Sequence, residues 1–514
     1  MASRGWIRRA VRVILATAVV ASATTVSAAP ERDRSSPFRR GPSRPSLDVR
    51  TAKGTSSAER EAGARRAATP MPSNGFEAIP RIGGHWPADP TGALGERWIL
   101  TAVNSSYALY DRSGVPAIGP NPLGSLLSTP RRARVFDPKI VFDQYRETFV
   151  LAYLVVDDVQ RRSWISLIAI PDATATDPAT WCGTRIVADR TAGDGKQLAD
   201  YTGLGYDEEH VVVSANAYDF SDHRFSGATV LSFLKDRLYD CTRTVAFDTF
   251  TGAETRNPSG TPGFTLQPAS TVGTAGPLYL TSFDPGRPNY VVLWRLDERE
   301  GEIVLRNVAI RVPSVHIAGF GTQRGGDLDR RDTWWDPGDL RVVSTFSDLE
   351  LGRVFTAHVV GRDLRPDIGR SYTEAAIRWY EIQPSPALRA TRVVRMGTIG
   401  APQTDAGWPS LATDSAGNLF VTYSRASAVT REFLSAWIAE VEPGTSLETT
   451  ALLASGTARL EAVEGPERWG DYTAISRDPL DGRFVLAVNQ VTVSDGQGPT
   501  REWRQTVHVV SHTP

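Results

Sequence analysis

The sequence predicts an all-β protein, a seven-bladed β-propeller of four-stranded antiparallel blades, preceded by a signal peptide and a disordered linker. Three observations lead to this prediction. A unit of strand, turn and second strand recurs along the chain after residue 80. Few segments have helical apolar spacing, and short strands alternate with Gly and Pro. The first 80 residues contain an export-signal pattern followed by a stretch that is poor in large apolar residues.

The N-terminus has the three-part layout of a secretory signal. Arginines precede the apolar run VILATAVVASATTV, and the small residues Ala28 and Ala29 follow it. The run is shorter than the roughly 20 residues that a membrane-spanning helix needs. We therefore expect a signal peptide over residues 1–28, export to the extracellular space and no membrane span.

Residues 29–78 are rich in Pro, Ser, Ala and Arg, and they contain almost no large apolar side chain before Phe76. Such a segment cannot bury enough apolar surface to offset the entropy of ordering it. The sequence therefore predicts a disordered linker here, and a propeller over residues 79–514.

The repeat determines the predicted architecture. Clear copies read DPKIVFDQYRETFVLAY, DYTGLGYDEEHVVVSAN, WPSLATDSAGNLFVTYS and DYTAISRDPLDGRFVLAVN. Two weaker copies and an altered first copy bring the number to seven. The copies start at Trp86, Asp137, Asp200, Gln267, Trp335, Trp408 and Asp471. From the second copy on they are about 63 to 73 residues apart, which accommodates four strands of about 5 to 6 residues plus loops. A sandwich would not repeat seven times, and a β-helix would need a shorter period.

In a propeller, the starts of the repeats meet on one face, at the mouth of the axial channel. The candidate catalytic residues there are the carboxylates Asp137, Asp200, Asp336 and Asp471. The candidate ligand-binding residues are Asn104, Asn216, Trp335, Trp408, Arg468, Trp469 and Asn489. Indole rings stack on sugars, and amides and carboxylates bond hydroxyls, so this set points to a glycan or another extracellular ligand.

Each of these features has a structural alternative. An Asp at a strand start often caps a turn through nearby backbone N–H groups. Arg468 could clamp a ligand carboxylate or pair with Asp200 or Glu467. The long segment from His316 to Asp339 could carry function or be a solvated loop held by its own ion pairs.

Several function classes lack support in the sequence. The net charge of −1 argues against nucleic acid. The seven histidines form no HExxH motif and have no metal-ligand spacing with a second His or Cys, so no catalytic zinc site is expected. No cofactor is predicted, although calcium on the carboxylate ring stays open, since oxygen ligands suit this cation. Cys182 and Cys241 are expected to form a disulfide, because pairing is the default in a chain that is expected to be exported. We expect a monomer.

The phrases VNSSYALYDRSG, DPKIVFD, IRWYEI and RWGDYTAISRDP resemble secreted bacterial β-propeller proteins of unassigned activity, related at fold level to the sialidase-like propellers. The resemblance spans about residues 80 to 512 and implies architecture. A sialidase would carry intact Asp-box turns and an arginine triad, which cannot be assigned here, so that activity is not carried over.

Two functions follow from these expectations. The leading one is a secreted propeller that binds glycan or another extracellular ligand at the channel mouth without catalysis. The alternative is a carbohydrate-active enzyme, a glycosidase or polysaccharide lyase, that uses the carboxylates or Tyr and Arg at the same mouth. Whether the protein is an enzyme is left undecided by the sequence.

Overall fold

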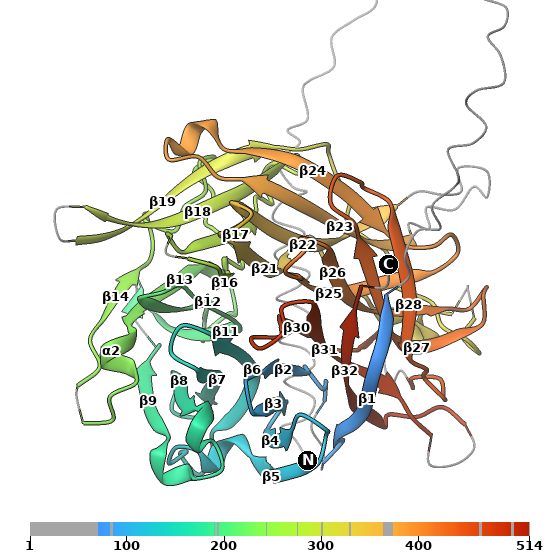
Figure 1. Cartoon of the computed structure of the whole chain (residues 1–514), viewed down its shortest axis with the longest axis horizontal. Helices are drawn as coiled ribbons and strands as arrows, with labels where there is room; N and C mark the ends of the chain where they lie inside the picture. The colour runs from blue at the N-terminus through green and yellow to red at the C-terminus, as the bar shows by residue number, and fades with distance from the viewer. Residues whose placement is uncertain are drawn as a thin grey trace, which may run out of the picture.

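The chain is an all-β propeller built mostly of four-stranded antiparallel sheets (Figure 1). The computed structural model describes residues 70–82, 86–189, 191–192, 195–242, 244–274, 276–299, 302–327, 330–362, 374–461, 465–494 and 498–512. The predicted signal peptide and nearly all of the predicted linker lie outside these residues. Among the described helices, none is long and apolar enough to cross a membrane.

Five sheets are separate and four-stranded. The first sheet consists of β2 (Thr91–Leu94), β3 (Trp98–Val103), β4 (Ser106–Asp111) and β5 (Pro116–Pro122). The second sheet consists of β6 (Arg134–Asp143), β7 (Thr148–Asp157), β8 (Arg162–Pro171) and β9 (Cys182–Val187). The third is β15 (Gln267–Pro268), β17 (Tyr279–Phe283), β18 (Tyr290–Arg299) and β19 (Glu302–Arg311). The fourth is β25 (Asp405–Thr413), β26 (Leu419–Ser427), β27 (Glu432–Val441) and β28 (Glu448–Ala454). The fifth is β30 (Ala474–Arg477), β31 (Phe484–Thr492), β32 (Trp503–Ser511) and β1 (Met71–Pro80).

The predicted count of seven blades is not what the sheets show. In place of two further separate sheets there is one ten-stranded sheet. It contains β11 (Gly195–Tyr206), β12 (His210–Asp219), β13 (Phe225–Leu234) and β14 (Phe247–Phe250), with β10 (Thr191–Ala192) paired to β11. It continues through β16 (Ser270–Val272) into β21 (Val342–Asp348), β22 (Arg353–Arg362), β23 (Glu374–Gln383) and β24 (Arg392–Ile399).

Strand β16 causes this merger, because it pairs in parallel with both β11 and β21. Gly205 lies at the junction. A Cβ atom at Gly205 would meet the carbonyl oxygen of Ala269 at 2.3 Å, so only glycine permits this close approach. Strand periodicity describes neighbours within a sheet and carries no information on such contacts between sheets, so the sequence did not reveal the merger.

The ring is closed by the two ends of the chain. Strand β1 pairs antiparallel with β32, and Figure 1 shows the blue N-terminal strand beside the red C-terminal one. Strand β1 thus starts at Met71, inside the predicted linker and before the predicted boundary at residue 79. Phe76 explains the difference, since its ring lies 5.0 Å from the ring of Tyr110 and anchors the strand.

The core lies between neighbouring sheets. All ten residues of β7 are buried, which is typical of a strand covered on both faces. Its side chains contribute alternately to two apolar clusters: Val150 packs with residues of β12, and Leu151 packs with residues of β3. Each sheet is thus packed on both sides.

A buried aspartate ends or directly follows the first strand of five sheet units, on the face opposite the mouth. Its carboxylate accepts hydrogen bonds from backbone N–H groups two to four residues later, as in an Asx turn. The five are Asp143, Asp207, Asp348, Asp414 and Asp478. They account for the Asp-bearing turn of the repeat.

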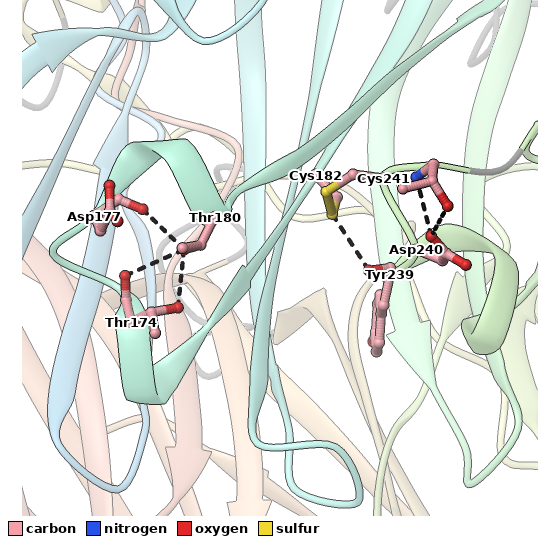
Figure 2. The surroundings of a disulfide bond; sticks show 8 residues. Thr174, Asp177, Thr180, Cys182, Tyr239, Asp240 and Cys241 are labelled. Atoms are coloured by element: carbon pink, nitrogen blue, oxygen red, sulfur yellow. Dashed lines mark hydrogen bonds between the residues drawn. A yellow bond between two sulfur atoms is a disulfide. The ribbon is translucent and has the colours of Figure 1, made fainter.

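Cys182 and Cys241 form the predicted disulfide. Figure 2 shows that it joins the start of β9 to the segment just after the short helix α2 (Lys235–Leu238). The bond therefore links two neighbouring sheet units. The carbonyl oxygen of Tyr239 lies 3.3 Å from Cys182 Sγ.

Buried His358 in β22 should make the protein sensitive to acid. Its Nδ1 lies 3.1 Å from the Leu340 carbonyl oxygen and must donate to it, so Nε2 accepts from the Tyr380 hydroxyl at 3.1 Å. Burial lowers the pKa of His358 to about 3. Between about pH 6.5 and pH 3 the unfolded chain binds a proton here that the folded chain does not, so stability is lost as pH falls.

We expect this residue to reduce the free energy of unfolding by about 2 kcal/mol between pH 8 and pH 5. Urea denaturation of wild type and His358→Asn at both pH values measures the effect. The variant should lose less stability on acidification than the wild type. Equal losses in the two proteins would show that His358 is not responsible.

Candidate functional site

The first strand of several sheet units has an irregular backbone in it or just before it, at the channel mouth. Residues at these points have positive φ, namely Asp89 (50°), Asp137 (53°), Tyr201 (59°), Thr265 (50°) and Trp408 (54°). This left-handed conformation is unfavourable for residues other than glycine and is found where the surroundings enforce it. The strand registers slip at three of these points, between Phe136 and Lys139, Asp200 and Gly203, and Gly407 and Ser410.

The bulges turn backbone N–H groups toward neighbouring sheets, and polar side chains accept them. The Asp137 N–H donates to Asn104 Oδ1 at 2.9 Å, and the Thr265 N–H donates to Asn216 Oδ1 at 2.8 Å. Asn489 Oδ1 accepts from the Ser424 hydroxyl at 3.0 Å. Asn216 and Asn489 are buried, so the structure uses their amides to hold sheets together rather than to line the mouth.

The three predicted tryptophans are also interior. Trp335, Trp408 and Trp469 are 0%, 4% and 1% exposed and belong to one apolar cluster. Each indole N–H is already bonded, to the Thr322 carbonyl at 3.1 Å, the Asp336 carbonyl at 2.9 Å and the Ser424 hydroxyl at 3.0 Å respectively. Their rings are therefore not open to stack on a sugar. Sequence reasoning could not separate a stacking indole from a core indole.

The centre of the mouth is a group of three carboxyls, Asp89, Asp137 and Asp471, each with an oxygen atom within 4.8 Å of the others. Asp89 was missed by the sequence analysis. The signal was available, because the Asp-Pro pair at residue 89 repeats at residues 137 and 336. Asp89 Oδ1 accepts the Asp471 N–H at 2.6 Å, and the Asn104 side-chain amide donates to Asp89 Oδ2.

Two of these carboxyls are buried, and burial raises the pKa of both. The pKa of Asp89 is raised to about 7, with the Asp471 charge as the second cause. The pKa of Asp137 is raised well above its usual value, with the charges of Asp200, Asp89 and Asp471 adding to burial. Asp137 Oδ2 accepts the Tyr201 N–H at 2.9 Å and the Tyr472 hydroxyl at 3.1 Å. Asp137 thus bonds two other segments rather than capping its own turn.

The other predicted carboxylates are half-buried and reach solvent. Asp471 forms an ion pair with Arg468. Asp336 Oδ1 accepts the Gly338 N–H at 2.9 Å as a turn cap, and burial raises its pKa to about 6. Burial, with the charge of Asp471, raises the pKa of Asp200, whose carboxylate accepts no hydrogen bond from any described residue.

Arg468 is positioned by two long connections that meet over the mouth. Strands β20 (Trp335–Asp336) and β29 (Glu467–Arg468) pair in parallel. Buried Gln323 fixes the same contact, since its Nε2 donates to the Thr333 and Leu460 carbonyls, each at 3.0 Å, and its Oε1 accepts the Leu460 N–H at 2.8 Å. The described part of the segment from His316 to Asp339 is therefore folded onto the rest of the protein, and is not a solvated loop.

Oxygen atoms of Asp89, Asp137 and Asp471 are the ligands closest to a cation-binding arrangement among the described residues. Such hard oxygen donors suit calcium rather than zinc. Arg468 already pairs with Asp471, and its positive charge opposes a bound cation.

No family model matches the chain, and no curated protein matches it. Solved structures match at low similarity. A protein of unknown function from Dyadobacter fermentans has a TM-score of 0.41 and 11% identity, covering 75% of this chain and 97% of that one. The GH93 alpha-L-arabinofuranosidase of Fusarium graminearum has a TM-score of 0.38 and 8% identity, covering 86% and 98%. The endo-arabinase from Bacteroides thetaiotaomicron has a TM-score of 0.31 and 14% identity, covering 64% and 95%. At these values the matches say nothing about what this chain binds.

Proposed function

We propose that the protein is a secreted binding protein that takes a glycan at the channel mouth without turning it over. The observation that carries the proposal is that the carboxyl groups at the mouth fall into a buried set and a half-buried set. Asp89 and Asp137 are buried and bonded within the protein, whereas Asp200, Asp336 and Asp471 form a half-buried polar rim with Arg468. Such a rim can bond several hydroxyl groups at once.

Asp200 is the rim residue whose carboxylate most needs a hydrogen-bond donor from a ligand. Its carboxylate has no hydrogen bond to a described residue, although Asp471, Arg468 and Arg341 all act on it electrostatically. A partly desolvated carboxylate without a donor is costly. A sugar hydroxyl or a protonated amine would supply the missing donor.

Secretion belongs to the same proposal. The signal-like N-terminus precedes a domain that contains a disulfide, and disulfides are typical of oxidising compartments. The binding function then operates outside the cell, on a glycan of the cell surface or its surroundings.

The test uses a glycan array followed by titration calorimetry on the glycan that binds. Asp200→Asn and Asp471→Asn should each weaken binding at least about tenfold, equivalent to about 1.4 kcal/mol. Asp222→Asn is the matched control, since Asp222 is exposed and pairs only with Arg224. Absence of binding to every glycan, or equal weakening by the control, would refute the proposal.

One observation favours a glycosidase as the second candidate. Buried Asp89, whose pKa is raised to about 7, lies beside Asp471, which pairs with Arg468. Carboxyls in contrasting environments are the usual acid and nucleophile pair, and an oxygen separation within 4.8 Å is near the roughly 5 to 5.5 Å of retaining enzymes. Release of reducing sugar from a polysaccharide panel, lost in Asp471→Asn but kept in Asp222→Asn, would support this function over simple binding.

A further inference from the structure

Lys139 differs from every other lysine that the structure describes. The whole chain contains four lysines. Of the three in the described part, Lys235 lies 2.7 Å from Asp143 and Lys196 lies 3.7 Å from Asp189. The side-chain amine of Lys139 has no ion pair within 4.0 Å and no hydrogen bond to any described residue, although its backbone is paired opposite Ala152 in the β6–β7 ladder.

The surroundings of Lys139 hold the amine at the mouth. Residue 139 follows the Asp137 bulge in β6 by two positions. Its Nζ lies 3.7 Å from the centre of the Tyr472 ring, and the Tyr472 hydroxyl donates to Asp137 Oδ2 at 3.1 Å. The amine is thus placed on an aromatic face beside the Asp89, Asp137 and Asp471 group. The residue is half-buried, and its Nζ is not among the fully enclosed polar atoms without a partner.

From this arrangement we propose that Lys139 is a reactive amine that captures an aldehyde-bearing ligand as an imine. The aldehyde class fits a reducing sugar end, and that identification rests on the proposed glycan function. The reactivity of the amine does not rest on it.

The protonation states fit this chemistry. A lysine without a carboxylate partner in a partly desolvated site loses its proton more readily. Burial lowers the pKa of Lys139 to about 7, against the opposing charges of Asp137, Asp89 and Asp471. A substantial fraction of neutral amine is therefore present at neutral pH.

The reaction balances without an added oxidant or reductant. The nitrogen lone pair of the amine attacks the carbonyl carbon, the C–N bond forms, and the carbonyl oxygen takes a proton. The hydroxyl then accepts a second proton and leaves as water while the C=N bond forms, and over the whole sequence the nitrogen gives up both of its protons. The neighbouring carboxyls with raised pKa, Asp89 and Asp137, are suited to supply and recover these protons.

The test treats the secreted chain, as purified, with glycolaldehyde and cyanoborohydride at pH 7.5, which fixes any imine as a stable amine. Peptide mass spectrometry then gives the labelling rate of each lysine. We expect Lys139 to be labelled at least about tenfold faster than exposed Lys196, in line with its larger neutral fraction. Lys235, enclosed and paired with Asp143, should be labelled slowest.

Lys139→Arg keeps the positive charge and should abolish the fast adduct, whereas Lys196→Arg should leave it unchanged. Equal rates at Lys139 and Lys196 in the wild type would overturn the proposal, and this comparison needs no variant to fold. Fast labelling of Lys139 in a protein that binds no glycan would sustain the reactive amine while refuting the glycan function. Glycan binding by a protein whose Lys139 is unreactive would support the glycan function and refute the reactive amine.

Discussion

Replacing Asp143 by alanine should lower the free energy of unfolding by about 3 to 5 kcal/mol, since it leaves a buried charge without its partner. The Asp143 and Lys235 side chains are both 0% exposed, and Oδ2 lies 2.7 Å from Nζ. Tyr239 donates a second hydrogen bond to the same oxygen at 2.9 Å. Tyr145 and Tyr206 cover the lysine, with ring centres 4.8 and 5.2 Å from Nζ.

Urea denaturation measures the change, and Asp236→Ala is the matched control. Asp236 follows Lys235 in α2, and its exposed side chain pairs with Arg146 at 3.2 Å. Such a surface pair contributes less than about 1 kcal/mol. A loss below about 1 kcal/mol in Asp143→Ala would show that water or a neighbouring group compensates Lys235. The double change Asp143→Leu with Lys235→Met should recover most of the lost stability, because it removes both charges.

Replacing both cysteines by serine should lower the free energy of unfolding by about 4 kcal/mol on the chain-entropy account. The bond joins residues 59 apart in sequence, so its removal lets the unfolded chain explore many more conformations. Thermal or urea denaturation of Cys182→Ser/Cys241→Ser measures the loss. Adding a thiol reductant to the wild type should reproduce it, and adding the reductant to the variant should change nothing further.

The disulfide and the buried ion pair should act together. Tyr239 contacts Cys182 through its carbonyl oxygen and Asp143 through its hydroxyl, and α2, which carries Lys235, immediately precedes it. Residues that share a segment in this way usually show non-additive effects. We expect the combined variant to lose measurably less stability than the sum of the separate losses. Full additivity would show that the two features stabilise the protein independently.

The repeat could be predicted from the sequence because it depends on patterns among residues that are close together in the chain. Alternation of apolar residues and an Asp-bearing turn predicted the strands after Asp137, Asp200, Trp408 and Asp471, which appear as β6 with β7, β11 with β12, β25 with β26, and β30 with β31. Pairing of Cys182 with Cys241 was predicted from the expected compartment, and the structure confirms it. The merged ten-stranded sheet was not predicted, because it depends on β16 contacting two sheets at Gly205.

The sequence predicted only part of the candidate site. The expected meeting of residues from distant repeats is seen in Asp137, Tyr201 and Asp471, which are joined through hydrogen bonds or ring contacts with Tyr472 and Asp89. The sequence did not predict which side chains face solvent. Trp335, Trp408 and Trp469 are residues of the type that stacks on sugars, but they lie in the core. Lys139 was overlooked because its significance comes from lacking a carboxylate partner.

The sequence by itself determined the all-β class, the succession of strand, turn and strand in the clear repeats, and the disulfide partners, since each depends on residue periodicity or on the count of two cysteines. Only the tertiary structure decided how the sheets join, where the N-terminal strand closes the ring, and which polar groups at the mouth are free. Those outcomes depend on contacts between segments hundreds of residues apart, such as the Asp471 N–H on Asp89. Burial and partner distance are properties of the packed chain, and no local pattern encodes them.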